Sequence, residues 1–331
     1  MTRDPKSDRK RRTGSAAKAP LKAPTKSGAK SSAKSTDKSA FEGDRIAKVL
    51  ARAGVCSRRE AEAYIAAGRV SVNGRKLASP AFNVVPQDHI SVDGKPVGAP
   101  DPPRLWRLHK ASGLVTTSRD PQGRPTIFQK LPAGLPRLNP VGRLDINTEG
   151  LILLTNDGGL KRLLELPSTG WQRRYRVRAF DGQKGGKNDN ALAEKLAALK
   201  QGITIDGVTY RGIDAGLERR VGGNVWLSMA LREGKNREIK RVLEHLDLQV
   251  NRLIRLSFGP FQLGQLAEGA VEEVPRRVLR QQLGKNWHML AGNGGDSSTG
   301  NENKYADAAP RREKKPARPA KTRKPDAYHR R

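Results

Sequence analysis

The stretch from Pro140 to Gly158, PVGRLDINTEGLILLTNDG, places a strongly polar segment directly before an unbroken apolar run. The run Leu151–Leu154 is followed by Asn-Asp-Gly, residues that favour turns, and this pattern predicts a buried strand. Arg143 and Asp145 lie just before that strand. Burying charged groups there is costly unless they pair with each other or take part in chemistry. The alternative interpretation is a polar turn that leads into an ordinary core strand.

The composition narrows the choice of partner. The 331 residues include 64 Lys and Arg against 33 Asp and Glu, which gives a net charge of +31. Such a surplus favours a polyanion, because neutralising phosphates releases counterions and adds affinity without sequence reading. No apolar segment approaches the ~20 residues that span a bilayer. We therefore expect nucleic acid, and no membrane, as the partner.

Cysteine and histidine usage indicates the compartment and the absence of a metal centre. The single cysteine, Cys56, excludes an intramolecular disulfide framework and a thiolate metal cluster. The five histidines are scattered without ligand spacing, so no metal site is expected. No apolar signal-peptide core lies near the N-terminus, and this predicts a cytoplasmic protein.

Two ordered domains are predicted between basic tails. Residues 1–42 and 291–331 are rich in Lys, Ala, Ser and Pro and contain few large apolar side chains, which predicts disorder. Residues 43–97 form a small domain, and the proline-rich segment 98–104, GAPDPPR, is the predicted linker. Residues 105–290 then form the larger domain.

The small domain begins with two predicted helices followed by hairpins. The second helix starts at a capping box made by Ser57 and Glu60, and Asn73–Gly74 is a strong hairpin signal. The segment RIAKVLARAGVCSRREAEAYIAAGRVSVNG resembles the S-four-type RNA-binding domain, which implies a basic face for structured RNA. The residues expected on that face are Arg45, Lys48, Arg58, Arg59 and Arg69.

The larger domain is predicted to be α+β, with a mainly antiparallel sheet as its scaffold. Leu105–Leu108 and Leu114–Thr117 are expected to pair as a hairpin. Arg174, Arg176 and Arg178 alternate with apolar residues, which predicts a strand with one basic face. The other expected elements are a helix at 190–199, a hairpin at 203–210, a strand at 225–231, a basic helix at 237–246 and a final strand at 250–256.

The residues of the larger domain suit an enzyme that acts on RNA. Asp145 lies beside Arg143, and Tyr175, Lys235 and Lys240 follow in later segments. Such an enzyme unstacks a base into a pocket and holds it against an aromatic ring. It also needs a carboxylate at the sugar that a nearby cation keeps ionised.

Several motifs in order resemble the pseudouridine synthases of the RsuA/RluB type. VGRLDINTEGLILLTNDG is similar to the family's catalytic motif, with LHKASGLVTT before it and RRYRVRA and EGKNREIKRVLEHLDLQVNRLIRLSFGPFQLGQL after it. The resemblance implies isomerisation of uridine to pseudouridine in ribosomal RNA, without metal or organic cofactor. GKNREIKRVLEHL and GWQRRYRVRA resemble the large-subunit enzymes more closely, so 23S RNA is the expected substrate and a monomer the expected state.

The resemblance also assigns roles to residues. Asp145 falls on the catalytic aspartate, which attacks the anomeric carbon or takes the neighbouring sugar proton. Tyr175 falls on the tyrosine that stacks on the base, and Lys240 on the basic residue that pairs with the aspartate. The family commonly has an arginine at that last position. Lysine offers a single ammonium charge there instead of the two parallel N–H donors of a guanidinium group. The residues expected to bind the substrate are Arg143, Leu253, Lys235 and Arg237.

Other interpretations stay open. Tyr175 as an ordinary sheet aromatic, Lys240 as an exposed helix charge and Leu253 as plain core are the structural alternatives. A non-catalytic RNA-binding ribosome-assembly factor and a small-subunit (16S) enzyme are the functional ones. A nucleoside hydrolase would need a second working carboxylate, Glu149 or Asp157, and nothing in the sequence favours either.

Overall fold

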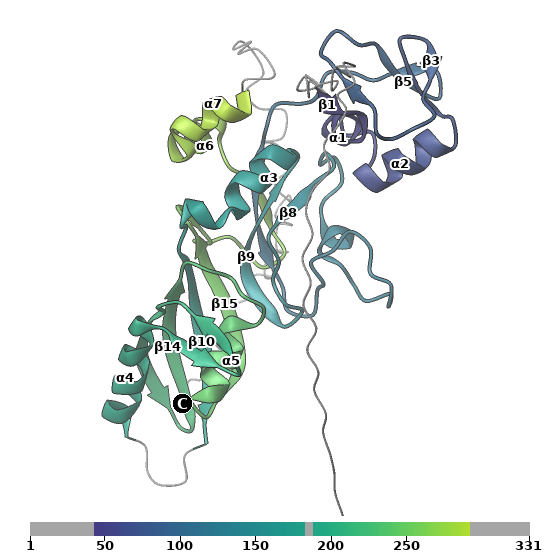
Figure 1. Cartoon of the computed structure of the whole chain (residues 1–331). Coiled ribbons are helices and arrows are strands. Elements are labelled where there is room, and N and C mark those ends of the chain that lie inside the picture. The colour runs from purple at the N-terminus through teal and green to yellow at the C-terminus, as the bar shows by residue number, and fades with distance from the viewer. Residues whose placement is uncertain (1–42, 183–187, 292–331) are drawn as a thin grey trace, which may run out of the picture. The chain divides into compact units, whose positions relative to one another are not determined.

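The computed structural model describes residues 43–182 and 188–291 (Figure 1). The predicted disordered tails therefore lie outside the described residues, apart from Ala291. Within the described part, helices and sheets are combined as the α+β prediction requires. A small helix-and-hairpin module precedes a larger module built on one mixed sheet.

The small module folds around the two predicted helices. Ser57 Oγ accepts the N–H of Glu60, and the Glu60 carboxylate accepts the N–H of Ser57, so the capping box forms. Asn73 and Gly74 both have positive φ, as a tight hairpin turn requires. Its elements are β1 (Asp44–Arg45), α1 (Ile46–Arg52), α2 (Arg58–Ala66), β2 (Val70–Val72), β3 (Arg75–Lys76), β4 (Asn83–Val84), β5 (Ile90–Val92) and β6 (Lys95–Pro96).

The larger module is organised by a nine-stranded sheet in the order β13-β14-β10-β15-β9-β7-β17, with β8 beside β9 and β16 beside β15. The β9–β15 pair is parallel, and every other pair in this sheet is antiparallel. The strands are β7 (Leu105–Lys110), β8 (Asn139–Val141), β9 (Thr148–Thr155), β10 (Arg173–Asp181), β13 (Asp214–Val221), β14 (Asn224–Leu231), β15 (Leu248–Phe258), β16 (Phe261–Gln262) and β17 (Val271–Glu273).

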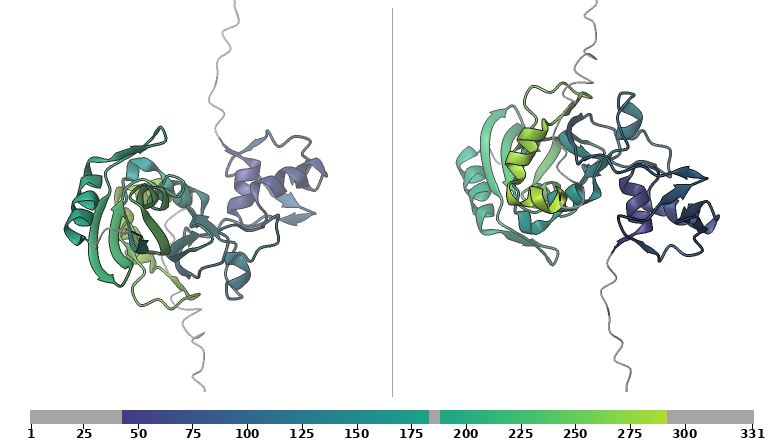
Figure 2. Two further views of the ribbon diagram at one scale, coloured as in Figure 1. Left: turned by 90° about the horizontal axis from the view of Figure 1, so that it is seen from below. Right: turned by 90° about the horizontal axis from the view of Figure 1, so that it is seen from above.

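Helices cover different faces along this sheet. α4 (Asp189–Ala198) and α5 (Glu238–His245) pack on one face of β13, β14, β10 and β15, around buried residues such as Val177 and Leu227. Figure 2 shows α4 along one side of these strands in both views. The remaining elements are α3 (Gly158–Glu165), α6 (Arg276–Leu283), α7 (Lys285–Ala291), the 3₁₀ turns η1 (Ile127–Lys130), η2 (Pro167–Thr169) and η3 (Leu199–Gln201), and the hairpin of β11 (Ile203–Ile205) and β12 (Val208–Tyr210).

The strand that follows the polar stretch is wholly buried. All eight residues of β9 are buried, including the predicted apolar run Leu151–Leu154. Gly150, in the same strand, has a φ of +98°, and a Cβ there would lie 2.3 Å from the carbonyl oxygen of Arg255. The two backbones meet closely at this point because residue 150 has no side chain. β9 is thereby joined to β15 in the middle of the sheet.

Two sequence predictions for this module are wrong. Leu114–Thr117 does not pair with the first strand, because β7 instead pairs with β9 and β17. The backbone of Val115 bonds to Pro125 and Ile127, so this segment is a loop. The strand at 250–256 exists within β15 but is not final, since β16, β17 and two helices follow. β13 was not predicted, because a bulge between Leu217 and Arg219 breaks its alternation.

Candidate active site

Asp145 lies in the short loop between β8 and β9, and its neighbours are fixed by hydrogen bonds. Thr116 Oγ1 donates to the carbonyl of Leu144 at 2.9 Å. The carbonyl of Ile146 accepts the N–H of Gly113 at 2.8 Å, and the N–H of Thr148 donates to the carbonyl of Asp145 itself. The residues on both sides of the carboxylate are therefore held by the 113–116 loop, which sequence analysis misassigned as a strand.

Lys110, at the end of β7, connects the same loop to the sheet through hydrogen bonds. Its side chain is fully buried at the end of β7, and Nζ donates to the carbonyls of Ala111, Ile146 and Thr148 at 2.8–3.1 Å. Burial lowers the pKa of Lys110 to about 8, and the charges of Glu149 and Asp145 act in the opposite direction. The group is thus still cationic at neutral pH, with three acceptors for its three N–H donors.

The carboxylate of Asp145 is paired with a lysine from a different part of the chain. Nζ of Lys240, on α5, lies 3.3 Å from Oδ2 of Asp145, and the lysine is the more buried partner. α5 presents Lys240 toward β9 because Ile239, Val242 and Leu243 fill the core on the helix's inner face. This pair is the arrangement that the sequence analysis expected for a catalytic carboxylate and its cation.

An open cleft of about 580 Å³ surrounds this pair. Tyr175 and Leu253 both line it, from β10 and β15 respectively. Leu253 is Cα partner of Val177 across these strands and of Thr148 on β9, so it lies on the floor beside the Asp145 loop. An aromatic ring and an apolar floor next to a carboxylate can hold a flat base against the sheet.

The other predicted substrate-binding residues also line the cleft, and they differ in exposure, hydrogen bonding and backbone conformation. Arg143 is exposed, two residues before Asp145. Lys235 is engaged, because Nζ bonds to the carbonyl of Thr209 and lies 3.3 Å from Glu233. Arg237 directly precedes α5, and its backbone φ of +52° is one that residues other than glycine rarely adopt. The cleft thus brings together all seven of the predicted catalytic and substrate-binding residues.

Sequence analysis missed four arginines that line the cleft: Arg173, Arg211, Arg232 and Arg255. Arg173 and Arg255 lie over the same ring, that of Phe258, with guanidinium carbons 4.7 and 5.3 Å from its centroid. Arg255 is buried, donates from Nε to the carbonyl of Leu151 and leaves Nη2 without a hydrogen bond. Sequence analysis could have found Arg255, because a residue two positions after Leu253 lies on the same face of the strand as Leu253.

A buried carboxyl group, Glu238, also lines the cleft. It accepts the N–H of Lys235 at 2.8 Å through Oε2, while Oε1 has no hydrogen-bond partner. Burial raises the pKa of Glu238 to about 7, and the N–H of Lys235 opposes this effect. Its role in the structure is to fix the loop that carries Lys235 into α5.

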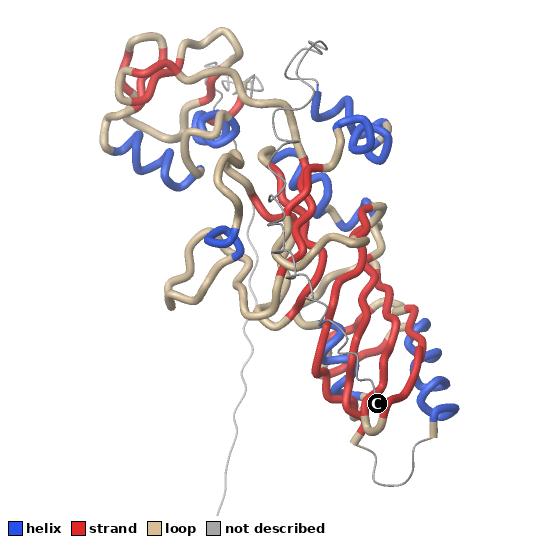
Figure 3. Tube along the Cα trace, turned by 180° about the vertical axis from the view of Figure 1, so that it is seen from behind, coloured by secondary structure: helices blue, strands red, loops and turns tan. Residues whose placement is uncertain are grey.

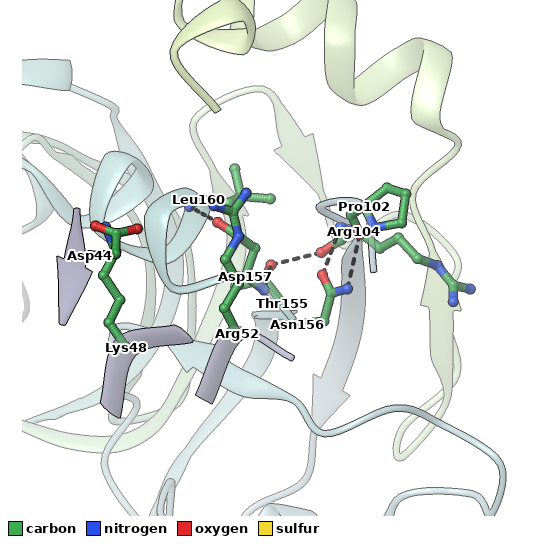
Figure 4. A network of polar contacts seen from close by, with 9 residues as sticks. All are labelled: Asp44, Lys48, Arg52, Pro102, Arg104, Thr155, Asn156, Asp157 and Leu160. Atoms are coloured by element: carbon green, nitrogen blue, oxygen red, sulfur yellow. Dashed lines mark hydrogen bonds and ion pairs between the residues drawn. The ribbon is translucent and has the colours of Figure 1, made fainter. Parts of the chain in front are cut away.

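The end of β9 is anchored by a separate polar network (Figure 4). The side chain of Asn156 accepts the N–H of Arg104 and donates to the carbonyl of Pro102, while Asp157 caps α3 by accepting the N–H of Leu160. Arg52 of α1 forms an ion pair with Asp157 at 3.1 Å. Glu149 and Asp157 are therefore both structural, since Glu149 pairs with Arg252 at 2.7 Å.

The basic residues predicted for RNA binding in the small module lie at its surface. Arg45, Arg58, Arg59 and Arg69 are exposed and Lys48 is half-buried. Arg69 pairs with Asp93 and lies over the ring of Tyr64 at 3.9 Å. Lys48 pairs with Asp44. Arg58 and Arg59, side by side at the start of α2, show no ion pair within the described residues.

The described residues contain neither a membrane-spanning helix nor a cluster of metal ligands. No helix in that part of the chain is long and apolar enough to cross a membrane. No group of three or more His, Cys, Asp or Glu side chains is arranged there to hold a metal ion.

These features define an RNA-modifying enzyme with its own RNA-binding module, and comparison with known proteins identifies the class. Residues 44–90 match the S4 domain, and residues 104–245 match the RNA pseudouridylate synthase model. An uncharacterized RNA pseudouridine synthase of Rickettsia prowazekii is 42% identical over 239 residues, which cover 72% of this chain and 97% of that protein.

Another relative has a more specific name. Ribosomal large subunit pseudouridine synthase B of Pseudomonas aeruginosa is 36% identical over 302 residues, covering 87% of this chain and 73% of that protein. A solved structure described as a pseudouridylate synthase shows 26% identity and a TM-score of 0.48, covering 72% of this chain and 99% of that one. The chain belongs to the RsuA/RluB-type family of RNA pseudouridine synthases.

Proposed function

We propose that this protein isomerises a uridine of large-subunit (23S) ribosomal RNA to pseudouridine, with Asp145 as the catalytic carboxylate. The observation that carries the proposal is the ion pair of Asp145 and Lys240 inside a cleft that Tyr175 and Leu253 also line. Relatives named ribosomal large subunit pseudouridine synthase B support the choice of RNA.

The reaction exchanges one glycosidic bond for another. The bond from C1′ of the ribose to N1 of uracil breaks, the base turns, and C5 of the base bonds to C1′. The proton on C5 is then lost and N1 gains one, so substrate and product are isomers. Asp145 acts at the sugar, either by attacking C1′ or by removing the C2′ proton, and both routes require an ionised carboxylate.

The neighbouring residues supply the environment for this step. Lys240 favours the charged form of Asp145, because a cation within a few ångströms stabilises a carboxylate. Tyr175 stacks on the flipped base and helps to remove the C5 proton, and Leu253 supports the base from below. Arg143 and Arg237 are exposed to the RNA around the flipped nucleotide. Lys235 would exchange its bonds to Thr209 and Glu233 for the RNA.

The same proposal covers the partner and the state of the protein. It works as a monomer in the cytoplasm, on ribosomal RNA alone or in precursor particles, and needs no cofactor because uracil is both leaving group and returning nucleophile. Arg45, Lys48, Arg58, Arg59 and Arg69 of the small module hold structured RNA. Residues 43–97 act as the RNA-binding domain and residues 105–290 as the catalytic domain, joined by the linker 98–104.

The first prediction concerns Asp145→Asn. The amide cannot act as nucleophile or base at the sugar, so pseudouridine formation should fall by at least a factor of about 10³ while RNA affinity stays within about twofold. The measurement is pseudouridine mapping of ribosomal RNA from cells that lack the protein and are supplied with either form. Asp206→Asn, an exposed aspartate in the β11–β12 turn, is the control and should retain activity.

The map also separates the alternatives. A site that disappears from 23S RNA and returns only with the unmodified protein supports the proposal. A site in 16S RNA instead would identify a small-subunit enzyme. An unchanged map, together with defective ribosome assembly that Asp145→Asn corrects, would identify a non-catalytic assembly factor.

A further inference from the structure

The strand face opposite the cleft carries an ordered set of side chains that the proposed reaction does not use. In β10, Val177 and Ala179 are buried in the core beneath α4 and α5, so the alternating Arg174, Arg176 and Arg178 point to the other face. In the view from behind, the strands of this half of the sheet lie in front of α4 and α5 (Figure 3). No helix of the described chain packs on this part of the sheet.

Strand register places one aromatic residue between two arginines on this face. Trp226 of β14 is the Cα partner of Arg178 on β10 and of Arg219 on β13. Adjacent strands are separated by about 4.8 Å, so the three side chains form a row about 10 Å long across the sheet. We call these three residues the Arg178–Trp226–Arg219 row.

Guanidinium groups lie against the indole of Trp226. The guanidinium carbon of Arg176 lies 4.6 Å from the ring centroid and that of Arg219 lies 6.0 Å from it. Arg176 is balanced by Glu218 at 2.8 Å. Arg178 and Arg219 are both exposed and show no carboxylate partner in the residues that the structure describes. Two positive charges therefore remain uncompensated on either side of a half-buried ring.

Small side chains follow Trp226 on the β13 side of this face. Beyond Trp226 along β14 stands Ser228, whose partners are Gly216 on β13 and Arg176 on β10. On the other side of the row, Phe180 of β10 is 44% exposed, an unusual position for a large apolar ring on an open face. The surface thus combines aromatic rings, guanidinium planes and two small residues.

We infer that this face is a second RNA-binding surface, which takes an unpaired segment of RNA away from the target uridine. Bases stack on aromatic rings and on guanidinium planes, and arginines neutralise the backbone phosphates. A single strand of RNA supplies both flat bases for the stacking ring and phosphates for the two uncompensated arginines, whereas an acidic peptide supplies only the anions. The inference rests on the proposed function only in that RNA is the partner.

The position of the surface tells what kind of RNA can use it. Tyr175 and Leu253 line the cleft on the α5 side of the sheet, and the Arg178–Trp226–Arg219 row lies on the reverse side. RNA that contacts both sites must pass around the border of the sheet, at the β13 edge or past the ends of the strands. A folded RNA with an extended unpaired segment meets this condition, and a short stem-loop that fills only the cleft does not.

The test separates charge from stacking. The double variant Arg178→Gln/Arg219→Gln should raise KM for long RNA about tenfold and reduce the slope of log affinity against log salt by about 1.4–1.8, with kcat unchanged. Trp226→Leu should weaken binding about tenfold with the salt slope unchanged, and Trp226→Phe should restore most of that loss. Arg277→Gln/Arg280→Gln, which removes two exposed charges from α6, is the matched control and should change neither quantity.

Binding is measured with full-length protein in the Asp145→Asn background as well, so the test does not depend on turnover. A double variant that behaves like the α6 control would overturn the inference, and so would equal losses for a short stem-loop and for the long RNA. Both charged side chains are exposed, so the double variant decides the question even if Trp226→Leu lowers the melting temperature. Absence of pseudouridine formation by the wild-type protein would refute the proposed function and leave this surface testable.

Discussion

Lys110 shows how a single buried charge supports a site that it does not enter. Its three N–H donors bond to carbonyls on both sides of the Asp145 loop. We predict that Lys110→Met leaves these acceptors unsatisfied and lowers the free energy of unfolding by about 2–4 kcal/mol. Activity should fall further than the unfolded fraction explains, because the loop loses its anchor.

The measurement is urea unfolding together with single-turnover rates on RNA. Lys130→Met, an exposed lysine of η1, is the control and should leave both quantities unchanged. If Lys110→Met lowers stability but every folded molecule reacts at the wild-type rate, the anchoring role is wrong.

Glu238 predicts a pH dependence of stability. Its pKa is raised from 4.5 to about 7 in the folded protein, so between these values the folded state keeps a proton that the unfolded state has lost. The stability linked to this group is therefore fully present below about pH 4.5 and is lost as the pH rises through 7. Glu238→Gln keeps an acceptor for the N–H of Lys235 and removes the ionisation.

We expect Glu238→Gln to match the wild-type protein at pH 4 and to exceed it by about 1–3 kcal/mol at pH 8. Urea unfolding at the two pH values measures the difference. Glu244→Gln, on the exposed side of α5, should show no such dependence. An equal effect of Glu238→Gln at both pH values would contradict the predicted ionisation.

Among strands and helices, the junction of β9 and β15 determines whether the cleft exists. It is the one parallel pairing of the large sheet and joins the strand after Asp145 to the strand that carries Leu253. Gly150→Ala would place a methyl group 2.3 Å from the carbonyl oxygen of Arg255, in a backbone conformation that already disfavours side chains. The strands must separate, and we predict a loss of stability of about 3 kcal/mol or more.

Gly222→Ala provides the matched control for that prediction. Gly222 also has a positive φ, of +62°, but a Cβ there would meet no atom within 4 Å. It should cost only about 1 kcal/mol, the conformational part of the effect. Denaturant unfolding compares the two variants, and equal losses would show that contact with Arg255 does not matter.

The elements that sequence analysis predicted correctly are those with local signals. The capping box at Ser57, the turn at Asn73–Gly74 and the buried run Leu151–Leu154 each form, because neighbouring residues determine them. The errors fall where distant residues decide. Leu114–Thr117 has the composition of a strand, yet β7 takes β9 and β17 as partners instead.

The site followed the same rule. Asp145, Tyr175 and Lys240 were chosen from motifs, and all three line one cleft. Lys110 and Glu238 were missed because their importance comes from burial and from carbonyl or N–H partners, which side-chain identity does not reveal. Arg255 could have been predicted, because it follows Leu253 by two residues on one strand and so lies on the same face.

For the molecule as a whole, the charge of +31 means that RNA binding should weaken steeply with salt. Arg58 and Arg59 of α2 contribute to that dependence if the small module binds RNA. We predict that Arg58→Gln/Arg59→Gln reduces the salt slope by about 1.4–1.8 and lowers affinity for ribosomal RNA at physiological salt. Electrophoretic mobility shifts at several salt concentrations measure both, with the α6 double variant Arg277→Gln/Arg280→Gln as control. If the salt slope of this variant equals that of the control, Arg58 and Arg59 of the small module do not contact the RNA.

The parallel junction of β9 with β15 also has a consequence for how the enzyme is made. Arg255 and the Leu151 carbonyl that it bonds are 104 residues apart in sequence. A growing polypeptide therefore presents its basic N-terminal module long before the strand that closes the cleft has left the ribosome. If the small module binds RNA as proposed, the nascent chain would bind RNA before it could modify it, and catalysis would begin only when β15 has been inserted between β9 and β10.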